Sequence, residues 1–133
     1  LKIYVQYIID SAANLMADNK KIITHLDIEP LQVAQKISFP LGLIVNEWVT
    51  NSVKYATPLT DSLEISVRLY NTGNDAIIIQ YNDNGKAQKE QPAKKSLGLE
   101  IVSILCEQLD GHLETNDLNP YHYKLTIPLT DGE

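Results

Sequence analysis

Polar side chains interrupt the otherwise apolar stretch LIVNEWVTNSVKYA, which spans residues 43–56. Four of them have the spacing i, i+3, i+4 and i+7, which places them on one face of a helix: Glu47, Thr50, Asn51 and Lys54. Amide and carboxylate oxygens suit a hard cation such as Mg²⁺, and a lysine suits a phosphate. The helix alone leaves two interpretations open, a seam that faces a ligand and a narrow solvent-exposed stripe.

A second group with possible chemistry lies in YNDNGK, where Asp83 and Gly85 follow a run of apolar residues. A carboxylate fixed at the end of a strand can accept a hydrogen bond from an exocyclic amine such as that of adenine. Glycine lets the backbone come close to a ring. The same residue types also make ordinary turns, so D-x-G by itself does not decide between a binding site and a plain turn.

A third group is KKSLGLEIV, which places Gly98 in the first turn of a predicted helix. Glycine is unfavourable there unless another group approaches the backbone. Helix N-termini bind anions through free N–H groups and the helix dipole, and Lys94 and Lys95 precede this one. The alternative is that Gly98 relieves packing and that both lysines are solvated loop residues.

Three helices are expected to position these groups. Residues 1–18 have the apolar spacing of a helix. Pro40 predicts the first turn of a second helix, which ends near Ala56. The third helix is predicted to begin after Ser96 as its N-cap and to stop at Gly111.

Strands are expected between the helices. The β-branched and alternating segments are residues 21–28, 63–71, 76–85, 112–116 and 122–129, and the turn NTGND joins the second to the third as a hairpin. The order of elements predicts an α+β fold. We expect a two-layer α/β sandwich, in which a mixed, mostly antiparallel sheet carries the helices on one face.

Composition limits the class of protein. The 133 residues fit a single domain over residues 1–133, and the net charge of -6 argues against a nucleic-acid partner. The lone Cys106, expected in the core, excludes an internal disulfide and a cysteine-built zinc site. No signal peptide or membrane-length apolar run is present, which predicts a cytoplasmic domain without membrane contact. Since it begins without Met, the chain is expected to be part of a longer protein.

Taken in order, N-E-x-x-x-N-x-x-K-Y-A, D-x-G and S-L-G-L-x-I-V resemble the N box, G1 box and G2 box of the GHKL superfamily of ATPases, whose fold is the Bergerat fold. Within it, the chain is most similar to the ATP-binding catalytic domain of bacterial sensor histidine kinases. One subgroup writes its N box as N-E-L-V-T-N-A-x-K-Y-A, which residues 46–56 match nearly letter by letter. The resemblance covers essentially the whole chain.

The resemblance implies an ATP-dependent protein histidine kinase of a two-component system. Such a domain binds ATP or ADP with Mg²⁺ and donates the γ-phosphate to a histidine on a separate dimerisation domain, from which a response regulator takes it. The parent kinase can be membrane-anchored. None of His25, His112 and His122 fits the phosphoacceptor, because none is expected on an exposed helix.

Site residues follow from the same resemblance. Asn51 would ligate Mg²⁺, and Glu47 would stand where related ATPases activate water or would help to hold the hydrated metal. Asp83 would accept the adenine amine, with Gly85 giving room. The residues expected near the phosphates and the ribose are Lys54, Tyr55, Lys94, Lys95, Gly98 and Leu99.

Two departures from the pattern keep other functions open. Ala87 replaces the second glycine of the G1 box and Ser96 the first glycine of the G2 box, while the loop at residues 86–95 is short and has no phenylalanine. One alternative is an anti-sigma-factor-type serine kinase. The other is a degenerate nucleotide-binding module that serves only for interaction.

Overall fold

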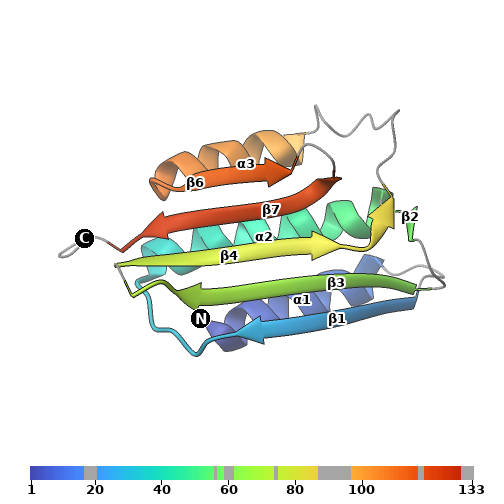
Figure 1. The fold of residues 1–133 in the computed structure, drawn as a ribbon, viewed down its shortest axis with the longest axis horizontal. Coiled ribbons are helices and arrows are strands. Elements are labelled where there is room, and N and C mark those ends of the chain that lie inside the picture. Colours follow the sequence, from blue (N-terminus) through green and yellow to red (C-terminus); the bar gives the residue numbers. More distant parts are fainter. Residues whose placement is uncertain are drawn as a thin grey trace.

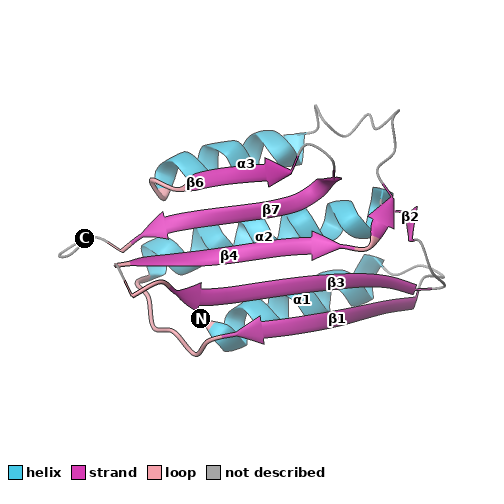
Figure 2. Cartoon of the chain, viewed as in Figure 1, coloured by secondary structure: helices cyan, strands magenta, loops and turns pink. Residues whose placement is uncertain are grey.

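The computed structural model describes residues 1–16, 21–55, 57–58, 62–73, 75–86, 97–116 and 119–129. A sheet forms one layer and three helices form the other, all on the same face of the sheet (Figures 1 and 2). The elements in chain order are α1 (Lys2–Met16), β1 (Lys21–Ile28), α2 (Gln35–Tyr55), β2 (Thr57–Pro58), β3 (Ser62–Asn71), β4 (Ala76–Asp83), β5 (Gly85–Lys86), α3 (Leu97–Gln108), β6 (His112–Asn116) and β7 (Asn119–Pro128).

The main sheet has five strands in the order β1-β3-β4-β7-β6. Only β1 and β3 run parallel, and the other neighbours are antiparallel. The predicted mixed, mostly antiparallel sheet with helices on one face is therefore confirmed, as is the β3–β4 hairpin. A separate ribbon pairs β2 with β5.

The core lies between the sheet and the helices. Strands β3 and β4 alternate so that every second side chain is buried under the helix layer. From α2, the buried apolar side chains that meet them are Leu41, Ile44, Val45, Trp48, Val49 and Val53. Each such side chain contributes about 1.5–3 kcal/mol by leaving water. Among the described side chains, two polar residues break this apolar layer, Ser52 of α2 and Asp83 at the end of β4.

The start of α2 differs from the prediction. The helix begins at Gln35, so Pro40 lies inside it and not in its first turn. The Ala34 carbonyl already accepts the N–H groups of Ile37 and Ser38, at 2.9 and 3.0 Å, which starts the helix before the proline. Pro40 has no N–H to bond the carbonyl of Lys36, a residue that is itself exposed.

The end of α3 is close to the prediction, but glycine is not the left-handed residue. Asp110 has a φ of 53°, and its N–H bonds the Glu107 carbonyl at 3.0 Å. Gly111 follows and donates to the Cys106 carbonyl at 2.8 Å, which completes a Schellman motif. A β-carbon at Gly111 would stand 2.9 Å from Leu125 of the sheet, so glycine serves close packing there.

Several sequence predictions concern residues that the structure does not describe. Residues 17–18 of the first helix, Ala56, Ala87, residues 88–95 and the expected N-cap Ser96 lie outside the described residues. Among the described helices, none is both long enough and apolar enough to cross a membrane.

The histidines and the cysteine lie where the sequence indicated. His25 is exposed in β1 with its Nε2 2.8 Å from Glu64 Oε1, and His112 opens β6. His122 belongs to β7, although its side chain is not described. Cys106 is buried in α3, and burial raises the pKa of its thiol.

Candidate functional site

The polar face predicted on the N-box helix is present on α2. Glu47, Thr50 and Asn51 are partly exposed, and Lys54 is exposed in the last turn. Their neighbours Trp48, Val49 and Val53 point into the core. Tyr55 ends the helix, but its side chain is not described. The polar residues thus form a seam along one side of a helix that is otherwise packed.

Asp83 is held where β4 ends and is only 3% exposed. The Ser52 hydroxyl donates to its Oδ2 at 2.6 Å, and the Gly85 N–H donates to its Oδ1 at 2.8 Å. The first bond joins the N-box helix to the D-x-G turn, and the second closes the turn on itself. The carboxylate that we predicted from the sequence to accept the adenine amine is therefore buried and held by two hydrogen bonds.

The turn itself is tied to the neighbouring strand. Asn84 Oδ1 accepts the Glu64 N–H at 2.8 Å, and Asn84 Nδ2 donates to the Ser62 carbonyl at 3.1 Å. In the small ribbon, Gly85 of β5 pairs with Pro58 of β2, just after α2. The end of the N-box helix and the D-x-G turn consequently share one corner of the fold.

An aromatic group backs this corner. Tyr81 is fully buried beside Asp83, and its hydroxyl lies 2.7 Å from Ser52 Oγ and 3.2 Å from the Trp48 carbonyl. Trp48 stacks on Tyr123, with ring centroids 4.9 Å apart and planes inclined by 3°. Tyr81, whose ring centroid lies 5.5 Å from that of Trp48, links this aromatic group to the Ser52–Asp83 contact.

Burial also sets the charge state of the corner. Desolvation raises the pKa of Asp83 above its ordinary value of 3.8, while the hydrogen bonds from Ser52 and Gly85 act in the opposite direction. Burial holds the pKa of Tyr81 well above 10.0, so this phenol stays neutral. A carboxylate with a raised pKa and spare acceptor capacity is well suited to receive a ligand N–H donor.

Gly98 lies in the first turn of α3 and faces the seam of α2. A β-carbon added there would overlap the Glu47 carboxylate and would stand 3.0 Å from Glu47 Cδ. The group that approaches this glycine backbone is therefore a side chain of the N box. Leu99 follows in the same turn and is partly exposed, whereas Lys94 and Lys95 lie outside the described residues.

Helix α2 is thus the common neighbour of the other two motifs, through Ser52 to Asp83 and through Glu47 to Gly98. The sequence interpretation assigned no role to Ser52, which lies in the buried arc of α2. A signal was present, because a hydroxyl within the buried arc of a helix needs a hydrogen-bond partner.

The seam also fits a magnesium site that is completed by a nucleotide. Glu47 and Asn51 offer a carboxylate and an amide oxygen one turn apart on the partly exposed face. The described residues contain no cluster of three His, Cys, Asp or Glu side chains suited to a metal. Mg²⁺ typically takes few protein oxygens, keeps several waters and binds substrate phosphates, so a small donor set is the expected one.

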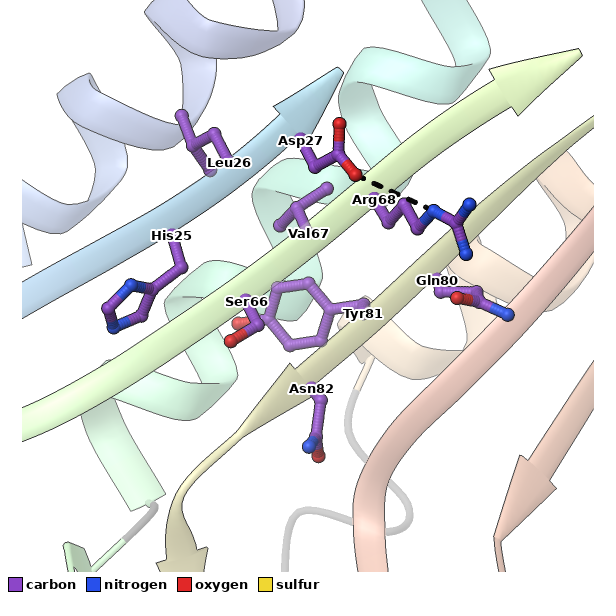
Figure 3. A pocket seen from close by; sticks show the side chains of 9 residues that line it. All are labelled: His25, Leu26, Asp27, Ser66, Val67, Arg68, Gln80, Tyr81 and Asn82. Carbon is purple, nitrogen blue, oxygen red and sulfur yellow. Dashed lines mark ion pairs between the residues drawn. The ribbon is translucent and has the colours of Figure 1, made fainter. Parts of the chain in front are cut away.

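A hollow of about 570 Å³ lies elsewhere, over β1, β3 and β4. Figure 3 shows its polar side chains on the face of the sheet away from the helices, including His25, Arg68 and Asn82. Arg68 there approaches Asp27 at 3.6 Å. The residues that line this hollow include neither Asp83 nor any part of α2, so it is separate from the predicted nucleotide site.

No protein-family model matches the sequence, and a search of curated proteins finds no match. Solved structures do match. The histidine kinase domain of the Erythrobacter litoralis blue-light activated histidine kinase EL346 aligns with a TM-score of 0.81 at 20% identity, over 96% of this chain and 60% of that chain. The Acinetobacter baumannii histidine kinase AdeS aligns with a TM-score of 0.70 at 18% identity, over 98% and 65%. Full-length ShkA in complex with AMPPNP aligns with a TM-score of 0.67 at 18% identity, over 95% and 30%.

These alignments show the fold. The chain has the α+β fold of the matched histidine kinase structures, as the sequence resemblance led us to expect. It spans about 60% of the EL346 kinase domain and 46% of the larger EL346 structure.

Proposed function

We propose that this chain is the ATP-binding catalytic domain of a two-component sensor histidine kinase. In this role it binds ATP with Mg²⁺ and presents the γ-phosphate to a histidine on the dimerisation domain of its parent kinase. A response regulator then receives the phosphoryl group. The fold shared with histidine kinase structures supports this proposal, and one of them, ShkA, was solved with AMPPNP.

The observation that carries the proposal is the convergence of the three motifs on α2. Ser52 bonds Asp83 across 2.6 Å, and the Glu47 carboxylate fills the space in front of Gly98. A plain turn at Asp83 would need no buried partner on a distant helix. A purely solvent-exposed stripe would not place Glu47 against the first turn of α3.

Each residue has a distinct part in binding. Asp83, buried and fixed, accepts the exocyclic amine of adenine, and Gly85 leaves room for the ring. The N-terminus of α3 favours the negative charge of the phosphates, and Gly98 and Leu99 bring backbone N–H groups close to them. Lys54, exposed at the end of α2, adds positive charge. Tyr55, Lys94 and Lys95 are proposed to lie around the ribose and phosphates on sequence grounds alone.

Asn51 and Glu47 would hold the Mg²⁺ together with the phosphates and water. The ion supplies charge neutralisation for the phosphate oxygens. No residue of the domain needs to form a covalent bond. Its part is to orient the terminal phosphoryl group and to stabilise charge as the acceptor histidine approaches.

Calorimetric titration with Mg-ATP tests the proposal. We expect binding with a Kd between micromolar and millimolar, roughly −8 to −4 kcal/mol. GTP should bind more weakly, because guanine presents a carbonyl where Asp83 requires an amine donor. Absence of both heat and competition at millimolar ATP would contradict the proposed function.

A further inference from the structure

Ser52 is completely buried within the apolar side of α2, yet it carries a hydroxyl. Such a group is costly to bury without a hydrogen bond. Its oxygen lies 2.6 Å from Asp83 Oδ2 and 2.7 Å from the Tyr81 hydroxyl, so it connects the helix to two residues of β4. We propose that Ser52 is a positioning residue for nucleobase selectivity, whose hydroxyl fixes the Asp83 carboxylate in the orientation that accepts the adenine amine.

The direction of these hydrogen bonds follows from the chemistry of the groups. An ionised carboxylate can only accept, so the single Ser52 proton goes to Asp83. Tyr81 must then donate to Ser52 Oγ, while it shares its proton with the Trp48 carbonyl at 3.2 Å. The result is a chain of donors from Tyr81 through Ser52 to Asp83. In such a chain each hydroxyl polarises the next.

The two bonds to Asp83 also fix its plane. The terminal torsion of an aspartate is broad, so one contact would leave the carboxylate free to rotate. Here Ser52 holds Oδ2 from the helix, and the Gly85 N–H holds Oδ1 from the turn. A carboxylate has about four acceptor positions, and these two bonds leave acceptor capacity for a ligand amine in a defined direction.

Among the residues that the structure describes, few titratable groups act on this corner. The negative charge of Asp83 raises the pKa of Tyr81 on β4, and Tyr123 on β7 raises it as well. The influences on Asp83 are burial, Ser52 and Gly85. Ser52 thus supplies one of the two hydrogen bonds that replace the lost hydration of the carboxylate. Without it, Asp83 would be less well oriented, and its pKa would rise further, which favours the neutral carboxyl over the charged acceptor.

This inference rests on the proposed ATP-binding function, and a nucleobase comparison separates the two. The probes are Mg-ATP and the Mg²⁺ complex of purine riboside triphosphate, which lacks the 6-amino group. For Ser52→Ala we expect about a tenfold loss in ATP affinity, the size expected for a hydrogen bond to a charged group. Affinity for purine riboside triphosphate should change less than about twofold, because that base gives Asp83 no donor. Tyr81→Phe should have a smaller effect in the same direction.

A double-mutant cycle supplies the second readout. In an Asp83→Asn background, Ser52→Ala should cause no further loss of ATP affinity, since both act through the same acceptor. Val5→Ala is the matched control, because Val5 is fully buried in α1 and belongs to no part of the site. It should lower the stability without changing the ratio of the two affinities.

The outcomes are distinct. If the parent chain binds neither nucleotide, the proposed function is wrong and the role of Ser52 falls with it. If the parent binds ATP but Ser52→Ala weakens both nucleotides equally, or weakens neither, the positioning role is wrong and the proposed function stands. Additive losses in the double variant would likewise overturn the positioning role.

Discussion

The carboxylate of Glu47 on α2 lies directly in front of the Gly98 α-carbon in the first turn of α3, in space that a β-carbon would need. Alanine is otherwise the better helix former, by up to about 1 kcal/mol. In a Glu47→Ala background, Gly98→Ala should therefore stabilise the fold by that amount. With Glu47 present the gain should vanish or reverse, because the carboxylate must move. Urea unfolding of the parent, the two single variants and the double variant measures the difference.

Gly42 provides the control for this cycle. A β-carbon there would stand 2.6 Å from the Tyr4 hydroxyl and 2.7 Å from Ile8, at the contact between α1 and α2. Gly42→Ala should destabilise the fold by the same amount whether or not Glu47 is present. Equal effects of Gly98→Ala in both backgrounds would show that the Glu47–Gly98 contact is energetically unimportant.

Asp83→Asn tests the adenine acceptor. The amide can still accept the Gly85 N–H, but it loses the charge and turns an NH₂ group toward other donors. We expect ATP binding to weaken by about 1.5–3 kcal/mol, with a melting temperature close to that of the parent. Calorimetry with Mg-ATP and thermal unfolding measure the two effects. A variant that binds ATP as tightly as the parent would remove Asp83 from the site.

The same variant should reveal a pH effect on stability. Burial holds the pKa of Asp83 above its ordinary value of 3.8. The contribution of the protonated carboxyl to the unfolding free energy is thus fully present below pH 3.8, and it is lost as the pH rises through the raised pKa of the folded state. The Asp83→Asn side chain does not ionise. The unfolding free energy of this variant should therefore increase relative to that of the parent over this pH window, and the difference should be constant at higher pH. If the unfolding free energy of Asp83→Asn minus that of the parent stays constant or falls as the pH rises, this assignment is wrong.

Most of the fold could be predicted from the sequence, because the apolar residues of the helices and strands recur with clear helical or strand periods. The β-branched segment at 21–28 and the hairpin of β3 and β4 were found in the predicted places. The start of α2 was not, because proline preference is a local signal, whereas the helix is started earlier by bonds to the Ala34 carbonyl.

The site was predictable only in part, and the reason is geometric. Glu47, Asn51 and Asp83 have residue types and spacing that suggest chemistry by themselves. Ser52 does not, because its importance depends on Asp83, which is 31 positions away in sequence and 2.6 Å away in space. The group that approaches Gly98 could not be predicted from the sequence either. A glycine in the first turn of a helix indicated that some group lies close to its backbone, but not that this group is the Glu47 side chain.

Asn51→Ala separates metal binding from base recognition. Loss of the amide oxygen should remove a protein ligand of Mg²⁺, while Asp83 still holds the adenine. Phosphoryl transfer to a dimerisation domain with an exposed helical histidine should then be abolished, although some nucleotide stays bound. Transfer measured with γ-labelled ATP, beside calorimetry on the same variant, tests this. Full transfer by Asn51→Ala would show that the metal is held without it.

The last prediction concerns this chain without such a domain. Its three histidines all lie on strands: His25 in β1, where it pairs with Glu64 at 2.8 Å, His112 at the start of β6, and His122 in β7. Transfer requires the imidazole to come within near-attack distance of the phosphoryl group. A histidine on a strand is fixed in the sheet, so no movement of a helix or domain can bring it to the phosphoryl group. The chain should therefore bind Mg-ATP without labelling itself, and a dimerisation domain should restore labelling on its own histidine. Acid-labile phosphate mapped to His25, His112 or His122 would overturn the proposal that this chain binds ATP while a separate domain provides the phosphoacceptor histidine.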